Sequence, residues 1–292
     1  MNIDQPLIDG EIPAGERRSP SRKYPWAIVV VIVLFVIIPF ISWYGTWFGR
    51  PLSDAKMEEY LNDRDKPRNV QHALAQIGNR IIDGDEAVKR FYPAVISASQ
   101  HEQAEVRMTA AWAMGQDNAY QDFHPALLSL LQDPIAGVRH NAALALVRFG
   151  DTSGRPEIVA MLEPATLRAE SSGTVELIIK EEGAPVAAGA PLARITHPDG
   201  SKVEVRAAEA GRIDSISAAD GKSVEIGDEL MTLSPSPDQV WEALRALYLV
   251  GRPDDIPHVQ RYTRPSATMP DRVRQQAAST VDAIRGGTGK TP

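Results

Sequence analysis

The feature that most constrains this chain is a helical hairpin that recurs along it at a nearly constant interval. Its clearest copy spans residues 133–162, where Asp133 is a favourable N-cap, Pro134 suits a first helical turn and Gly150 ends the first helix. Apolar residues recur at helical spacing on both sides of the polar turn that follows. Because one hairpin cannot bury both of its apolar faces, the pattern predicts a stack of hairpins, an α-solenoid.

Further copies of the hairpin are marked by a Val at the equivalent position, at Val70, Val106, Val240 and Val273. The spacing is 32 residues from Val106 to Val138 and 33 residues from Val240 to Val273. The motifs Asp-Pro, Val-Arg, Ala-Ala-x-Ala-Leu and Gly-Asp within 133–162 resemble those of HEAT-like repeats of the phycobilisome-lyase type. That resemblance implies HEAT-like repeats over residues 53–163 and again over 236–286.

One segment, 164–235, interrupts the helical period and carries a duplication of its own. Its apolar residues alternate with a period of two, which is typical of strands, and eight positions recur 38 residues later. The matched pairs are Gly173/Gly211, Val175/Ile213, Ile178/Ile216, Gly183/Gly221, Val186/Val224, Gly189/Gly227, Leu192/Leu230 and Ile195/Leu233. A turn at 197–200, HPDG, joins the halves, so the segment is predicted to be a small β-sandwich inserted between repeats.

The paired Gly-x-x-Val-x-x-Gly-x-x-Leu pattern resembles the biotinyl/lipoyl barrel of carrier domains and of the membrane-fusion adaptors of bacterial export systems. The resemblance implies an inserted all-β barrel-sandwich hybrid. Carriers place their modified lysine at the tip of the central hairpin, which here corresponds to Asp199-Gly200. Lys202 lies two residues further along, on a strand, so we expect neither biotin nor lipoate, and no cofactor.

An apolar stretch at 27–48 contains no ionisable acid or base and would span roughly 33 Å as a helix, enough to cross a bilayer. The bulky residues after Phe40 offer no signal-peptide cleavage site, which favours an uncleaved transmembrane helix over 25–48. Basic residues in the polar segment 1–24, which is expected to be disordered, predict an N-terminus in the cytoplasm. The chain is therefore predicted to be a single-pass protein of a bacterial inner membrane with periplasmic C-terminal domains and a flexible tail at 287–292.

Composition excludes several classes of function. The chain has no Cys, so disulfides, thiol catalysis and thiolate metal sites are excluded. Its net charge of −7 is spread along the sequence without a basic stripe, which argues against nucleic acid as a partner.

Two further motifs suggest catalysis or ligand binding, but each lacks residues that the function requires. Gly289-Lys290-Thr291 imitates the end of a phosphate-binding loop, but Ile284 stands where that loop requires a Gly. Some HEAT-like proteins are hydroxylases that hold iron with several His-Glu dipeptides, whereas His101-Glu102 is the single such pair here. The other histidines are expected to be surface residues: His72, His124, His140, His197 and His258. We therefore predict no catalytic, cofactor-binding or metal-binding residues.

Arg107, Arg139 and Arg274 occupy the same place in their repeats. They are interpreted as a ladder in which each Arg pairs with a loop Asp and ties adjacent repeats together; the alternative is a basic stripe that binds a partner. Trp112 and Trp241 are interpreted in the same way, as packing between repeats.

None of these predicted parts contains residues for catalysis or for binding a cofactor, whereas solenoids offer long surfaces for binding partner proteins. The predicted function is therefore that of a non-catalytic, membrane-anchored scaffold or accessory subunit of a membrane-embedded protein complex in a bacterial envelope. Its second predicted contact is with the lipid bilayer, through residues 27–48, and no small-molecule substrate is evident. The alternative is a periplasmic adaptor of an export or efflux system, although such adaptors place a helical hairpin between the two barrel halves. An enzyme of the lyase or hydroxylase type is a third hypothesis, which rests on repeat resemblance alone.

Overall fold

The computed structural model describes Val33, Phe35 and residues 51–63 and 65–287. The predicted segments 1–24 and 25–48, apart from those two residues, and the tail beyond 287 lie outside the described residues. Within the described part, no helix combines the length and the apolar character needed to cross a bilayer. The chain up to Pro51 is a separate unit, and everything below concerns the compact unit that begins at Leu52.

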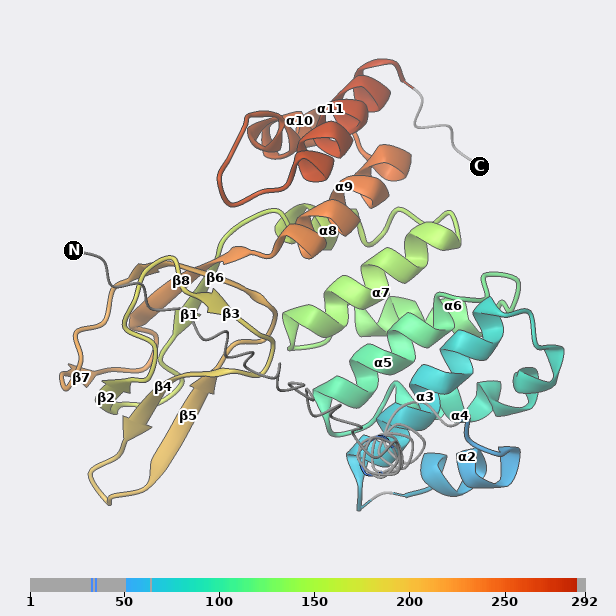
Figure 1. Cartoon of the computed structure of the whole chain (residues 1–292), viewed down its shortest axis with the longest axis horizontal. Coiled ribbons are helices and arrows are strands. Elements are labelled where there is room, and N and C mark those ends of the chain that lie inside the picture. Colours follow the sequence, from blue (N-terminus) through green and yellow to red (C-terminus); the bar gives the residue numbers. More distant parts are fainter. Residues whose placement is uncertain (1–32, 34, 36–50, 64, 288–292) are drawn as a thin grey trace, which may run out of the picture. The chain divides into compact units, whose positions relative to one another are not determined.

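In the sequence of this unit, helices both precede and follow a sheet-rich region, which lies to one side of them in space (Figure 1). A short helix α2 (Asp54–Leu61) precedes helical pairs at the predicted repeat positions. The pairs before the sheets are α3 (Pro67–Ile82) with η1 (Glu86–Phe91) and α4 (Tyr92–Ala98), α5 (Ala104–Met114) with α6 (Phe123–Leu130), and α7 (Ala136–Arg148) with α8 (Arg155–Ala160). After the sheets come α9 (Pro237–Val250), η2 (Pro253–Asp255), α10 (Ile256–Gln260), η3 (Arg261–Thr263) and α11 (Asp271–Arg285).

The start of α7 differs from the prediction. The helix begins at Ala136 with Ile135 as its N-cap, so Asp133 and Pro134 precede it. The Asp133 carboxylate accepts a hydrogen bond from the Ile135 N–H at 2.9 Å, but its main partner is Arg107 of the preceding repeat. Asp133 therefore connects repeats rather than capping its own helix.

Small residues allow neighbouring repeats to pack closely. A Cβ at Gly78 of α3 would collide with the ring of Trp112 on α5, so Trp112 packs between repeats as predicted. Within one repeat, a Cβ at Gly154 would lie 2.6 Å from the Cα of Ala143, so the start of α8 also packs closely against α7. Trp241 of α9 also packs against the helical core, and it lies beneath the guanidinium groups of Arg245 and of Arg272 on α11, the helix of the next repeat.

The helical core continues across the sheet-rich region. One buried cluster contains Ile158 and Leu162 from before the sheets together with Val240 and Leu244 from after them. Tyr262 donates its hydroxyl hydrogen to the Leu162 carbonyl oxygen at 2.6 Å, and Gln239 Nε2 donates to the Met161 carbonyl oxygen at 3.2 Å. The α8 and α9 hairpins thus pack as consecutive repeats although the sheets lie between them in sequence.

Two four-stranded sheets form the sheet-rich region, and they share no strand. The strands are β1 (Ala165–Arg168), β2 (Gly173–Leu177), β3 (Pro185–Val186), β4 (Pro191–Thr196), β5 (Lys202–Arg206), β6 (Gly211–Ile216), β7 (Ser223–Val224) and β8 (Glu229–Pro235). One sheet has the order β1-β8-β6-β3 and the other β5-β4-β2-β7. Advancing each strand of the first order by four places, cyclically, produces the second order, so the 38-residue duplication appears in space as two related sheets.

Equivalent glycines in the two halves have the same structural role. A Cβ at Gly173 would lie 2.5 Å from the Thr196 carbonyl oxygen, and one at Gly211 would lie 2.5 Å from the Ser234 carbonyl oxygen. The sheets enclose their own core, in which Val175 and Ile213 are matched and buried. Sheet and helical cores are therefore separate clusters.

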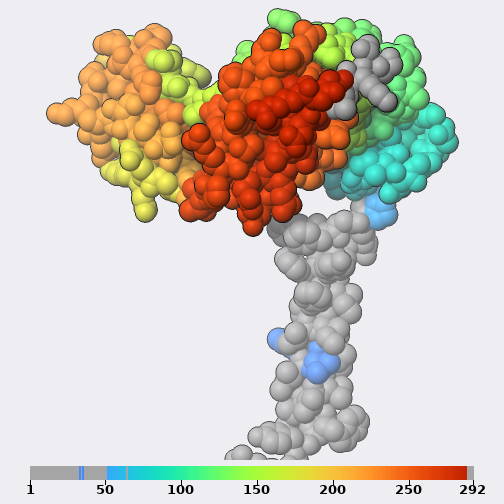
Figure 2. All heavy atoms as spheres, turned by 90° about the horizontal axis from the view of Figure 1, so that it is seen from above, coloured from blue at the N-terminus to red at the C-terminus, as the bar shows by residue number. Residues whose placement is uncertain are grey.

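The sheet-rich region enters and leaves the helical array at one place. Ala165 of β1 is paired with Leu233 of β8, so the first and last strands are neighbours where they join α8 and α9. The strands gather to one side of the helices, and the space-filling view shows them as a distinct lobe (Figure 2).

Candidate functional site

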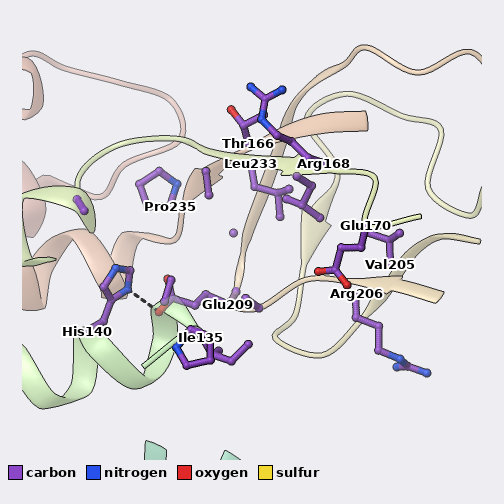
Figure 3. A pocket seen from close by; sticks show the side chains of 18 of the residues that line it. Ile135, His140, Thr166, Arg168, Glu170, Val205, Arg206, Glu209, Leu233 and Pro235 are labelled. Atoms are coloured by element: carbon purple, nitrogen blue, oxygen red, sulfur yellow. Dashed lines mark hydrogen bonds and ion pairs between the residues drawn. The ribbon is translucent and has the colours of Figure 1, made fainter. Parts of the chain in front are cut away.

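A cavity of about 410 Å³ lies where the start of α7 meets the sheet-rich region (Figure 3). Ile135, Ala136 and His140 line it from the helical side. Strand β1, most of strand β5 and residues 208–211 line it from the sheet side. This volume falls in the range of ordinary ligand and side-chain pockets.

His140 connects the helical repeats to the sheets at this cavity. It is 6 % exposed, and its Nδ1 lies 2.8 Å from Oε1 of Glu209, which is 69 residues further along the chain. Its Nε2 lies 3.9 Å from Oε2 of Glu157, and that carboxylate also accepts a hydrogen bond from Arg139 at 3.0 Å. The expectation that His140 is a surface residue is wrong, because its side chain is buried beside the carboxylates of Glu209 and Glu157.

Acidic and basic side chains of the cavity lining point in different directions. Figure 3 shows the Glu170 carboxylate turned toward the interior, whereas the guanidinium groups of Arg168 and Arg206 extend away from it. Arg168 donates to the Gly227 carbonyl oxygen at 3.0 Å, and Arg206 donates to the Gly189 carbonyl oxygen at 2.8 Å. The interior is therefore acidic although both signs of charge occur in the lining.

Ser171, next to Glu170 in the lining, has an unusual hydroxyl. Its Oγ is buried and has no hydrogen-bond partner among the described residues. Buried hydroxyls are nearly always hydrogen-bonded, so an unpaired one beside a cavity is a position at which a bound molecule could complete the bonding.

The three equivalent arginines have a different kind of partner in each repeat. Arg107 binds both Asp133 oxygens, with Nε to Oδ2 at 2.6 Å and Nη2 to Oδ1 at 3.0 Å, so it ties adjacent repeats as the ladder interpretation predicts. Arg139 binds Glu157 within its own repeat, and Arg274 binds Asp271 on its own helix at 2.8 Å. The ladder thus holds at Arg107, whereas Arg274 has the expected partner, Asp271, in a pair that lies within one helix and does not connect repeats.

The pKa of the Asp133 carboxyl is shifted by its surroundings. Its burial alone would raise the pKa of the carboxyl, but hydrogen bonds from Arg107 and from the Ile135 N–H, with the nearby positive charges, lower that pKa below its ordinary value. The carboxylate is therefore held in its charged form.

The predicted hairpin is present between β4 and β5. His197 N–H donates to the Ser201 carbonyl oxygen at 2.9 Å, and Asp199 accepts from Ser201 at the turn. Lys202 is the first residue of β5, where it pairs with Thr196 of β4, so it belongs to the strand and not to the turn. No lysine stands on the turn itself.

The histidines do not gather into a metal site within the described ranges, where no group of three or more potential ligands is found. His101 accepts a hydrogen bond from the Gln103 N–H at 3.0 Å. His124 lies 2.7 Å from Asp151, and His258 lies 2.5 Å from Glu163, in two other repeats. Gly289-Lys290-Thr291 lies outside the described residues.

A second groove, of about 390 Å³, crosses the faces of α5, α7 and α9. Arg148 and Arg245 line it together with Trp112 and Leu249, which is 56 % exposed. It gives the helical array an amphipathic surface that spans three repeats.

Comparison with known proteins finds a family match mainly within the helical array that precedes the sheets. A family described as HEAT repeats matches residues 92–172, so the chain contains HEAT-like repeats next to a separate sheet-rich region. No curated protein sequence matches the chain.

Solved structures match over short stretches. The ectoine utilization protein EutE (DoeB) from Ruegeria pomeroyi is 35 % identical in its apo structure, over 24 % of this chain and 22 % of that one, with a TM-score of 0.22. Its product-bound structure is 32 % identical over the same shares. A single-chain, multi-domain long-chain acyl-CoA carboxylase is 29 % identical over 35 % of this chain and 11 % of that one, with a TM-score of 0.23. This chain spans less than a quarter of each, and TM-scores this low establish no shared overall fold.

Proposed function

We propose that this protein is a non-catalytic, membrane-anchored scaffold or accessory subunit that mediates protein–protein interactions in a bacterial envelope complex. The observation that carries the proposal is the continuity of the helical core across the sheets. Arg155 of α8 donates to Asp255 after α9 at 2.6 Å, so the repeats on the two sides of the sheets form one array. A continuous array with a second module projecting from it offers partners two distinct surfaces.

The sheet-rich module is proposed to be a biotinyl/lipoyl-like barrel-sandwich hybrid that serves for docking. The duplicated sheets and the matched Gly173 and Gly211 contacts support this assignment. The β4–β5 turn lacks the lysine that a carrier presents there. The same turn, residues 197–201, is too short to hold the helical hairpin of export adaptors, so scaffold function is preferred to adaptor function.

Residues 27–48 are proposed to anchor the protein in an inner membrane, with the N-terminus in the cytoplasm and the C-terminal domains in the periplasm. Support comes from the absence of charges in this stretch and from the basic residues before it. Because the chain has no Cys, an Ala188→Cys variant carries a single thiol, at an exposed position. A membrane-impermeant maleimide should label it in intact spheroplasts, whereas a Ser21→Cys variant should be labelled only after lysis. The reverse pattern would refute the topology.

The scaffold proposal is tested by affinity purification of the tagged chain from native membranes in mild detergent. We expect a stoichiometric membrane complex that survives size-exclusion chromatography. A transporter with an outer-membrane channel would instead identify an export adaptor. Recovery of the chain without any partner, in each of several mild detergents, would contradict the scaffold proposal.

A further inference from the structure

Two unpaired strand edges border the cavity at the start of α7. Strand β1 is the end strand of one sheet and β5 is the end strand of the other. All four residues of β1 line the cavity, as do four consecutive residues of β5, Val203 to Arg206. Because successive side chains on a strand point to opposite faces, consecutive lining residues show that the cavity meets each strand along its edge.

A free edge presents backbone N–H and C=O groups that an additional strand can pair with. Strand β5 is the longer of the two, and Val203 on it is 41 % exposed. Ile135, across the cavity, is 37 % exposed. An extended segment beside β5 would therefore find backbone partners on one side and apolar surface on the other.

The polar groups in the cavity indicate the chemistry of that segment. Glu170 has no ion pair or hydrogen bond within the described residues, whereas the other acidic groups of the lining are engaged: Glu209 with His140, Glu163 with His258, and Glu204 with Arg206. Beside it, the Ser171 hydroxyl also lacks a partner among the described residues. A cationic side chain supplies donors to both groups and places its apolar stem against the cavity wall.

We infer that this cavity docks an extended segment of a partner protein, which adds a strand to β5 and places a Lys or Arg side chain against Glu170. The inference deepens the proposed scaffold function and rests on it: the scaffold would hold its partner at the junction between repeats and sheets. The partner is defined by its chemistry, an extended segment with alternating apolar residues and one basic residue at a fixed position.

The test selects displayed random decapeptides on the full chain in detergent micelles. Retained sequences should share one basic position flanked by β-branched or apolar residues. A Glu170→Gln exchange should weaken their binding on the order of tenfold, because it removes a charge-assisted contact of about 1.4 kcal/mol. The matched control, Glu181→Gln, changes an exposed glutamate outside the cavity and should leave affinity unchanged.

The position of the peptide is tested by a photo-crosslinking residue at Val203. It should capture the selected peptide, whereas the same residue at Ile226, which is 71 % exposed and outside the cavity lining, should not. A consensus without a basic position, equal binding to the Glu170→Gln chain, or capture at Ile226 alone would each overturn the inference.

Purification from native membranes distinguishes failure of this inference from failure of the proposed scaffold function. If the Glu170→Gln and native chains retain the same complex equally, the complex docks elsewhere and the inference fails while the scaffold function stands. If neither chain retains a complex, the scaffold function fails, and the peptide selection still decides whether the cavity binds a basic segment.

Discussion

Arg155 and Asp255 form an ion pair at 2.6 Å although they lie 100 residues apart. The Asp255 side chain is 5 % exposed, and its second oxygen accepts a hydrogen bond from the Arg252 N–H at 2.8 Å. The pair joins the repeat before the sheets to the repeat after them. The repeats that precede and follow the inserted sheets therefore contact each other directly at this pair.

Removing this pair should loosen the array. An Arg155→Met exchange leaves the Asp255 charge buried and without its guanidinium, which costs on the order of 2–4 kcal/mol of unfolding free energy. Urea denaturation followed by far-ultraviolet circular dichroism measures the change. A Lys56→Met exchange, which removes the exposed Lys56–Glu59 pair, is the control and should lower the unfolding free energy far less than Arg155→Met does, because water screens exposed ion pairs. Equal losses in both variants would contradict a special role for Arg155.

The repeat and sheet patterns were predictable because they are local. Helical spacing and a recurring Val locate the hairpins, and a constant offset locates the two sheet halves. The cavity was not predictable, because it depends on single residues brought together from distant segments. His140 and Glu209 lie 69 residues apart, and neither belongs to a repeated motif. Arg139 was predicted to pair with the carboxylate of a loop Asp but pairs with Glu157 of α8, while it donates to the backbone carbonyl oxygen of Asp133.

Acid should weaken the helical array through Asp133. The pKa of its carboxyl is lowered in the folded protein, so its contribution is present above the unfolded pKa, near 4, and is lost as the pH falls through the folded value. The native chain should exceed an Asp133→Asn variant by about 1–3 kcal/mol of unfolding free energy at neutral pH. That difference should shrink progressively below about pH 4.

The measurement is chemical denaturation of both proteins across a series of pH values. Asp254→Asn, at an exposed position, is the control and should show a small difference that does not change in this way. A gap between the native and Asp133→Asn proteins that stays constant down to pH 2 would show that the Arg107–Asp133 pair does not depend on ionisation of the carboxyl.

Methyl groups at the two matched glycines should destabilise the sheets to a similar degree. A Cβ at Gly173 or at Gly211 would lie 2.5 Å from a backbone carbonyl oxygen, which side-chain rotation cannot relieve. Each Gly→Ala exchange should cost about 1–3 kcal/mol. Hydrogen exchange of amides in 165–235 reports the sheets separately from the helices, and Thr174→Ala, at an exposed position, is the control. Unchanged protection in the Gly211→Ala protein would contradict the equivalence of the two halves.

Lys202 should remain unmodified. It pairs with Thr196 at the start of β5, whereas carriers present their lysine on the turn. Co-expression with biotin and lipoate ligases followed by intact-mass measurement should show neither group. A mass shift that disappears in a Lys202→Arg variant would establish a carrier and refute the scaffold proposal.

Replacing residues 165–235 with a short Gly/Ser linker should leave a folded helical array. The strands at the two ends of this segment are neighbours, since Ala165 pairs with Leu233, and closing a short loop there costs only on the order of a few kcal/mol. The buried cluster that contains Leu162 and Val240 has no member in the sheets. The deletion variant should therefore keep a cooperative helical melt, while the isolated 165–235 fragment should fold as an all-β unit of modest stability. Loss of the cooperative melt, with the fragment unfolded, would show that repeats and sheets stabilise one another through contacts such as His140–Glu209 and are one folding unit.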